Sequence, residues 1–278
     1  MAIAGVIVGV LGPAAFVAGA TLSRAPARPG VALPASIASV GDSITRAFDV
    51  GWSSAVADRP EDSWSTGTAG ALGSQYQRIL TAEPAAGVRA YNDARVGASM
   101  AALDGQLAAA AAQHAQYVTV LMGANDVCTP SATTMTPTAL FTAEFTTALR
   151  DFTAADPGAH VFVSSIPDIY RLWTTFHSNV RARLTWALFG ICRSMLAPGT
   201  TDAERQQVAA REQADNAALA TVCQTRFAAR CRWDNYVTYN ADFPATWVST
   251  VDYFHPNVAG QRALAAITWA AGYWPSAP

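Results

Sequence analysis

The chain has 278 residues, 51% of them hydrophobic, and its 18 basic and 20 acidic side chains give a formal net charge of -2. This length and apolar content suffice for the core of one large α/β domain. The basic residues are all arginine and form no cluster, which argues against nucleic acid as a partner.

The N-terminal segment, residues 1–22, contains no charged side chain and ends near Ala18-Gly19-Ala20. An apolar run that closes on small residues is typical of a secretory signal peptide. No basic residue precedes the run, so an uncleaved N-terminal anchor is the alternative, and the arginines that follow it would then hold the body in the cytoplasm. Residues 23–34, rich in proline, arginine and alanine, are predicted to be a linker before one folded domain over 35–278.

Strand and helix patterns alternate along this domain. Short apolar runs predict strands over 36–40, 88–92, 117–122, 160–166 and 235–239. Helical periodicity predicts helices over 71–80, 99–113, 137–155, 203–228 and 257–273. Such alternation predicts an α/β fold with a doubly wound parallel sheet, whose ligand crevice lies beyond the carboxyl ends of the strands.

Two segments between predicted elements are unusually long, residues 49–70 and 167–201. Long connections in compact domains are often functional. Their aromatic residues either wall a substrate cleft or pack into the core, and packing is the commoner role. These residues are Trp52, Trp64, Tyr170, Trp173, Phe176, Trp186 and Phe189.

The four cysteines, Cys128, Cys192, Cys223 and Cys231, show no close metal-binding spacing. An even number in an exported chain indicates two disulfides. Of the three possible pairings we favour Cys128–Cys192 with Cys223–Cys231. Four free thiols in a cytosolic protein are the alternative.

Three short motifs follow predicted strands: Gly41-Asp42-Ser43, the run from Asn92 to Gly97, and Gly123-Ala124-Asn125-Asp126. Because parallel strands present their carboxyl ends at one edge of a sheet, Ser43, Gly97 and Asn125 are expected to converge there. Each motif alone is also an ordinary turn sequence. Their shared position relative to the strands is the stronger argument for a site.

A serine hydroxyl becomes a nucleophile when a base lies within hydrogen-bond reach. His255 is the best candidate, because Asp252 three residues earlier can hold one ring nitrogen while the other faces Ser43. The remaining histidines, His114, His160 and His177, lack a carboxylate at this spacing.

Asn125 offers a side-chain amide and Gly97 an unhindered backbone N–H, and with the N–H of Ser43 they would make three donors to an oxyanion. Asp42 and Asn92 are predicted to support these loops by hydrogen bonds. The site therefore predicts acyl transfer to water through a covalent Ser43 ester. No metal, P-loop or dinucleotide motif is present, so neither cofactor nor metal is implied.

This set of motifs resembles the GDSL, or SGNH, hydrolase family, named for the residue types found here as Ser43, Gly97, Asn125 and His255. The resemblance extends from residue 39 to about 270. It is greatest to the phospholipase B branch, through residues 62–65, 122–128, 166–169 and 254–256. Ile44 replaces the usual leucine, and residues 173–202 have no confident match.

The resemblance implies a secreted, metal-independent serine esterase or lipase, possessing a three-layer α/β/α sandwich with a five-stranded, flavodoxin-like parallel sheet. Its expected partner is a small-molecule or lipid ester, with transient contact to a lipid interface, and a monomer is expected. A carbohydrate O-acetyl esterase with the same site is one alternative. A non-catalytic binding module on the same fold is the other.

Overall fold

The computed structural model describes residues 30–51, 57–70 and 72–275. The predicted leader 1–22 and most of the predicted linker 23–34 lie outside these residues. The described part of that linker contacts the domain, since Trp274 Nε1 donates a hydrogen bond to the Val31 carbonyl at 2.8 Å.

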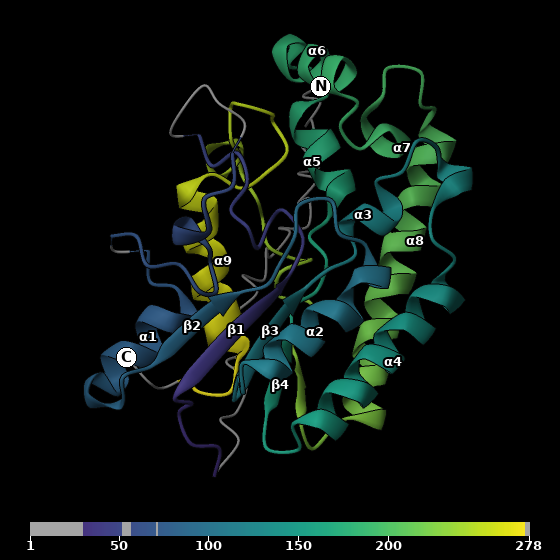
Figure 1. Ribbon diagram of the computed structural model, residues 1–278. Coiled ribbons are helices and arrows are strands. Elements are labelled where there is room, and N and C mark those ends of the chain that lie inside the picture. The colour runs from purple at the N-terminus through teal and green to yellow at the C-terminus, as the bar shows by residue number, and fades with distance from the viewer. Residues whose placement is uncertain (1–29, 52–56, 71, 276–278) are drawn as a thin grey trace, which may run out of the picture.

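A parallel sheet forms the centre of the molecule (Figure 1). In the described residues its strands are β1 (Ser36–Gly41), β2 (Arg89–Asn92), β3 (Tyr117–Leu121), β4 (His160–Val163) and β5 (Cys231–Trp233). They lie in the order β2-β1-β3-β4-β5, and every neighbouring pair is parallel. This is the predicted doubly wound sheet, and the predicted fold class is confirmed.

Helices cover both faces of the sheet, making three layers (Figure 1). One face carries α1 (Gln75–Ala82) and α9 (Val258–Ala271), and the other carries α2 (Leu103–Ala112), α4 (Thr138–Ala155) and α8 (Asp202–Thr221). A short helix, α3 (Ala124–Val127), follows β3 directly. Helix α8 runs on into one π-helical turn, Val222–Arg226.

Strand side chains alternate between the two cores, as a sheet buried on both faces requires. In β1, Ile37 belongs to the cluster under α1 and α9, whereas Ala38 and Val40 belong to the cluster under α2, α4 and α8. In β4, Phe162 and Val163 divide in the same way. Both faces are therefore apolar, which explains why the strands read as nearly continuous apolar runs.

The predicted fifth strand, residues 235–239, is wrong. β5 lies earlier, at Cys231–Trp233, and the chain then turns around Asp234. The Asp234 carboxylate accepts the backbone N–H groups of Ser165, Tyr236 and Thr238. Asn235 and Tyr236 have φ of +57° and +62°, a left-handed conformation incompatible with a strand.

The long segment 167–201 contains three helices where the sequence indicated only a long connection. They are α5 (Ile169–Phe176), α6 (Val180–Phe189) and α7 (Arg193–Leu196). Asp168 and Asn179 cap the first two, because their side chains accept backbone N–H groups of the first helical turn. Together these helices build the upper edge of the molecule in Figure 1.

The described residues contain two disulfides, of which the first fastens these added helices. Cys128 is bonded to Cys192, which ties the residue after α3 to the residue before α7, and Cys223 is bonded to Cys231, which ties the end of α8 to β5. This is the pairing favoured from the sequence. Within the described residues, we find no helix of the length and apolarity needed to cross a membrane.

Candidate active site

The turn that presents Ser43 follows β1 at the carboxyl edge of the sheet, next to β3, where the direction of strand order reverses. Gly41 begins this turn with φ of +150°, and a Cβ there would lie 2.3 Å from the Leu121 carbonyl oxygen. Only glycine fits this approach. The Asp42 Oδ1 atom then accepts the Ile44 N–H at 2.9 Å, which closes the turn around Ser43.

Two buried glutamines hold this turn from opposite faces of the sheet. Gln106 of α2 brackets Gly41, accepting its N–H at 2.7 Å and donating to its carbonyl at 3.0 Å. Gln261 of α9 donates to the Ile44 carbonyl at 2.8 Å and accepts the Trp64 N–H at 2.9 Å. Sequence reasoning missed both residues, and the only signal for them is a glutamine on the mostly apolar buried face of each helix.

Ser43, His255 and Asp252 form one chain of hydrogen bonds. His255 Nε2 lies 2.7 Å from Ser43 Oγ, and His255 Nδ1 is hydrogen-bonded to Asp252 Oδ2. All three side chains are buried. When Nδ1 carries the proton that is shared with the carboxylate, Nε2 faces the serine as a base.

The loop before α9 sets the histidine in place. Asp252 Oδ1 accepts the N–H groups of Phe254 and His255 at 2.9 and 3.1 Å, so one carboxylate orients both the backbone and the ring of His255. Phe48 and Phe254 contact the imidazole edge-on, with ring centroids 5.2 and 5.0 Å away. The ring therefore has little rotational freedom.

Gly97 and Asn125 lie where the motif order predicted, beyond β2 and β3. The Asn125 Nδ2 donates to the Ala98 carbonyl at 2.9 Å, and Asp126 Oδ2 accepts the Met100 N–H at 2.9 Å, so α3 holds the Gly97 loop. Among the residues that the structure describes, no partner takes the backbone N–H of Ser43 or of Gly97.

Asn92 connects the end of β2 to the nucleophile turn. Its Nδ2 donates to the Thr45 carbonyl at 3.0 Å and to the Thr66 hydroxyl at 3.2 Å.

On the other side of the turn, complete burial raises the pKa of Asp42 to about 7. Burial also raises the pKa of Asp126, to about 6.

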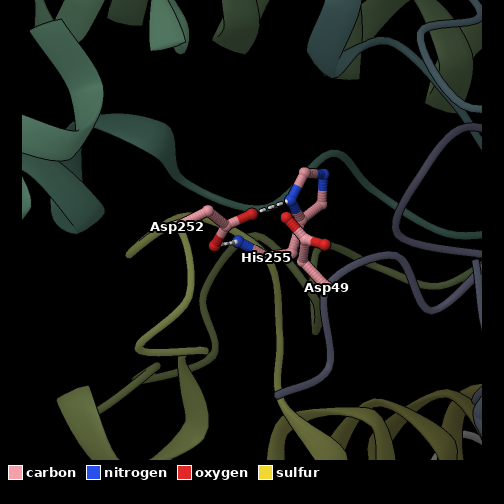
Figure 2. A group of neighbouring side chains, drawn as sticks. All are labelled: Asp49, Asp252 and His255. Carbon is pink, nitrogen blue, oxygen red and sulfur yellow. Dashed lines mark hydrogen bonds and ion pairs between the residues drawn. The ribbon is translucent and has the colours of Figure 1, made fainter. Parts of the chain in front are cut away.

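A second carboxylate, Asp49, lies beside the Asp252–His255 pair, as Figure 2 shows. It is buried, and its Oδ1 accepts the Ala57 N–H at 3.2 Å. Burial raises the pKa of Asp49, and the neighbouring Asp252 charge raises it further. No sequence signal identified this residue, because it reaches the site from the long segment after β1.

Asp49, Asp252 and His255 also form the one group of potential metal ligands in the described part of the chain, with ligand atoms within 4.8 Å of one another. Nδ1 of His255 is already hydrogen-bonded to Asp252. A cation would have to replace that hydrogen bond, so metal binding here would compete with the orientation of the imidazole.

A small cavity of about 50 Å³ lies against the site. Its wall includes Ile44, Ala124 and Phe254, the chain neighbours of Ser43, Asn125 and His255. The ion-paired Asp168 and Arg171, 3.6 Å apart, are its charged members. Other side chains that line it are Ile169, Leu172, Phe243 and Val248. The cavity is therefore mostly apolar, and three of its residues are chain neighbours of Ser43, Asn125 and His255.

The aromatic residues of the long segments mainly pack. Trp64, Phe176 and Trp186 are buried, while Tyr170 and Trp173 are half-buried and Phe189 is exposed. Trp52 lies outside the described residues. None of the described ones lines the small cavity, whereas Trp186 and Phe189 line a larger hollow.

The fold and motif set are those of an α/β ester hydrolase. The sequence profile of the GDSL-like lipase/acylhydrolase family matches residues 39–263, and the chain belongs to this family. It is a carboxylic ester hydrolase. No curated protein sequence matches the chain.

Solved structures share the fold at low sequence identity. An extracellular lipase from Streptomyces rimosus superimposes with a TM-score of 0.51 at 16% identity, covering 85% of this chain and 99% of that one. An acetylxylan esterase from Geobacillus stearothermophilus superimposes with a TM-score of 0.50 at 17% identity, covering 86% and 94%.

Proposed function

We propose that the protein hydrolyses carboxylic esters through a covalent Ser43 intermediate. His255 Nε2 takes the serine proton as Oγ attacks the ester carbonyl, and Asp252 stabilises the imidazolium that forms. The proton then passes to the departing alcohol, and a water molecule, activated by the same imidazole, cleaves the acyl-serine. The observation that carries this proposal is the hydrogen-bonded chain from Ser43 Oγ to Asp252, with 2.7 Å between hydroxyl and ring nitrogen.

The oxyanion of the tetrahedral intermediate would be held by three donors: the N–H groups of Ser43 and Gly97 and the side-chain amide of Asn125. Such donors stabilise the charge that develops only during the reaction. Asp42 and Asn92 support this set by fixing the nucleophile turn through Ile44 and Thr45.

The small cavity favours esters of short acyl groups. A site needs roughly 10–15 Å³ of accessible volume to hold one water, so an accessible volume of about 50 Å³ holds a few water-sized groups. An acetyl group fits this space, whereas a long acyl chain would have to leave it along the surface. The same observation favours a carbohydrate O-acetyl esterase as a second candidate function.

The test of the mechanism is Ser43→Ala, with Ser178→Ala as the matched control because Ser178 is exposed and outside the site. Hydrolysis of p-nitrophenyl acetate should fall about 10⁶-fold in the first variant and stay unchanged in the second. A fluorophosphonate probe should label only protein that retains Ser43. Activity that survives in folded Ser43→Ala would contradict the proposed nucleophile.

Substrate choice is tested by comparing p-nitrophenyl acetate, p-nitrophenyl palmitate, acetylated xylan and phosphatidylcholine. We expect the acetyl esters to react fastest. Faster turnover of palmitate or phospholipid would show that the small cavity does not limit the acyl group. We also propose an extracellular location, which the two disulfides support because such bonds persist in oxidising compartments.

A further inference from the structure

Helix α6 carries an apolar stripe that faces away from the protein. Val180, Leu184 and Leu188 are spaced four residues apart, so they form one ridge along the helix. Their exposed fractions are 66%, 66% and 78%, and Phe189 at the helix end is 67% exposed. Large apolar side chains gathered on one surface mark an interaction site.

The opposite face of α6 is fixed to the site. Ala182 and Trp186 are buried, and Trp186 Nε1 donates to the Tyr253 carbonyl at 3.2 Å, between Asp252 and Phe254 in the chain. The helix lies at the outer end of the molecule, beyond α5 (Figure 1). Its apolar stripe is thus held at a constant position relative to the His255 loop.

The chain segment that carries the stripe is positively charged. Residues 169–201 contain four arginines, Arg171, Arg181, Arg183 and Arg193, and no acidic residue, although the whole chain has a net charge of -2. At about 100° per residue, Arg181 and Arg183 flank the stripe on its two sides. Arg171 is paired with Asp168, but in the described residues the other three form no ion pair.

We propose that α6 docks the protein on an anionic lipid surface, with the apolar stripe among the acyl chains and Arg181 and Arg183 at the headgroup phosphates. An exposed apolar ridge with arginines on both sides offers the two contacts that such a surface favours, burial of apolar side chains and attraction to phosphate. A second copy of this chain fits the face less well, because pairing two stripes would bring unpaired arginines together. The docking does not depend on which ester is cleaved.

A hollow beside the helix adds to this surface. It measures about 770 Å³ and is lined in part by Leu188, Phe189 and Arg193. Glu204 is the acidic residue on its wall, and it is already engaged with Thr201, whose N–H and hydroxyl both donate to Glu204 Oε2. Arg193 therefore remains available to a phosphate that enters the hollow.

The test uses Ser43→Ala protein, so that binding is measured without turnover. Vesicles of phosphatidylcholine mixed with phosphatidylglycerol should co-sediment the protein, and added salt should weaken this binding. Leu184→Ser with Leu188→Ser should lower the partition coefficient at least about tenfold. Arg181→Gln with Arg183→Gln should weaken binding to the mixed vesicles but not to pure phosphatidylcholine.

Two matched controls come from α4, where Leu140 is 50% exposed and Arg150 lies on the surface. Leu140→Ser and Arg150→Gln should leave vesicle binding unchanged. Thermal unfolding checks that each variant is folded, and the arginine pair tests the proposal even if the leucine pair is unstable.

Three results would overturn the proposal. One is that the protein fails to co-sediment with mixed vesicles, and another is that the leucine pair and the arginine pair of substitutions in α6 both leave vesicle binding unchanged. The third result is a dimer of this chain that dissociates when Leu184→Ser and Leu188→Ser are introduced together. None of these would affect the Ser43 test on soluble esters, so the two proposals fail separately.

Discussion

At the scale of single residues, one substitution tests the proposed role of Asn125. Its amide donates to the Ala98 carbonyl and is the proposed side-chain donor to the oxyanion. Asn125→Ala should lower kcat on p-nitrophenyl acetate by ~10²–10³ and leave KM almost unchanged, because the lost donor acts mainly in the transition state. An unchanged kcat in a variant with the parent melting temperature would remove Asn125 from the oxyanion set.

Asp49 leads to a prediction about pH. Asp49→Asn keeps an oxygen to accept the Ala57 N–H but removes a negative charge beside His255. Loss of this charge disfavours a positive charge in the site, so the acidic limb of the kcat/KM profile should move to lower pH.

The control for Asp49→Asn is Asp151→Asn, which makes the same charge change at an exposed position on α4. Its pH profile should match that of the parent. If the acidic limb of Asp49→Asn also stays in place, the Asp49 carboxylate does not act on the imidazole.

At the scale of elements, the two disulfides should contribute unequally to stability. Cys128–Cys192 closes 64 residues of chain and Cys223–Cys231 closes 8. Loop-closure entropy predicts losses of roughly 4 and roughly 2.5 kcal/mol when each pair is replaced by serine. Denaturant unfolding of the two double variants measures this order, and equal losses would show that chain entropy is not the main contribution.

At the scale of the whole molecule, buried carboxyl groups should make stability depend on pH. Burial raises the pKa of Asp215 to about 7, and raises that of Glu212 well above its usual value. Because the folded chain binds these protons more tightly than the unfolded chain, their contribution to the free energy of unfolding is complete below about pH 4. For Asp215 it is lost as the pH rises through about 7, and for Glu212 it is lost as the pH rises through its raised pKa.

The corresponding variant is Asp215→Asn, which keeps an oxygen for the Thr138 hydroxyl. In the parent protein, the free energy of unfolding should fall between about pH 4 and 7. Asp215→Asn should reduce this fall by at most ~4 kcal/mol, since one pKa unit corresponds to 1.36 kcal/mol. Asp242→Asn, at an exposed site, should leave the slope unchanged. A slope that persists in Asp215→Asn would assign the pH dependence to other groups.

Much of the fold followed from local patterns. Buried parallel strands are apolar runs that end in turn residues, so β1 to β4 were predicted near their actual positions, and so were α4 and α9. The error at residues 235–239 has a tertiary cause. Asp234 bonds to Ser165 across the sheet, and no pattern in the local sequence reports a partner 69 residues away.

The sequence by itself determined the family, the parallel sheet and the candidate site residues Ser43, Gly97, Asn125 and His255, because their motifs follow strand ends that must share one edge. Only the tertiary structure decided what surrounds them. Gln106 and Gln261 reach the site from distant helices, and Asp49 turns back onto His255 from the loop that follows Ser43. The apolar stripe of α6 is exposed because Ala182 and Trp186 take the buried face. Helical spacing alone predicts neither the hydrogen-bond partners of the two glutamines nor the exposure of the α6 stripe, since both depend on what packs against the helix.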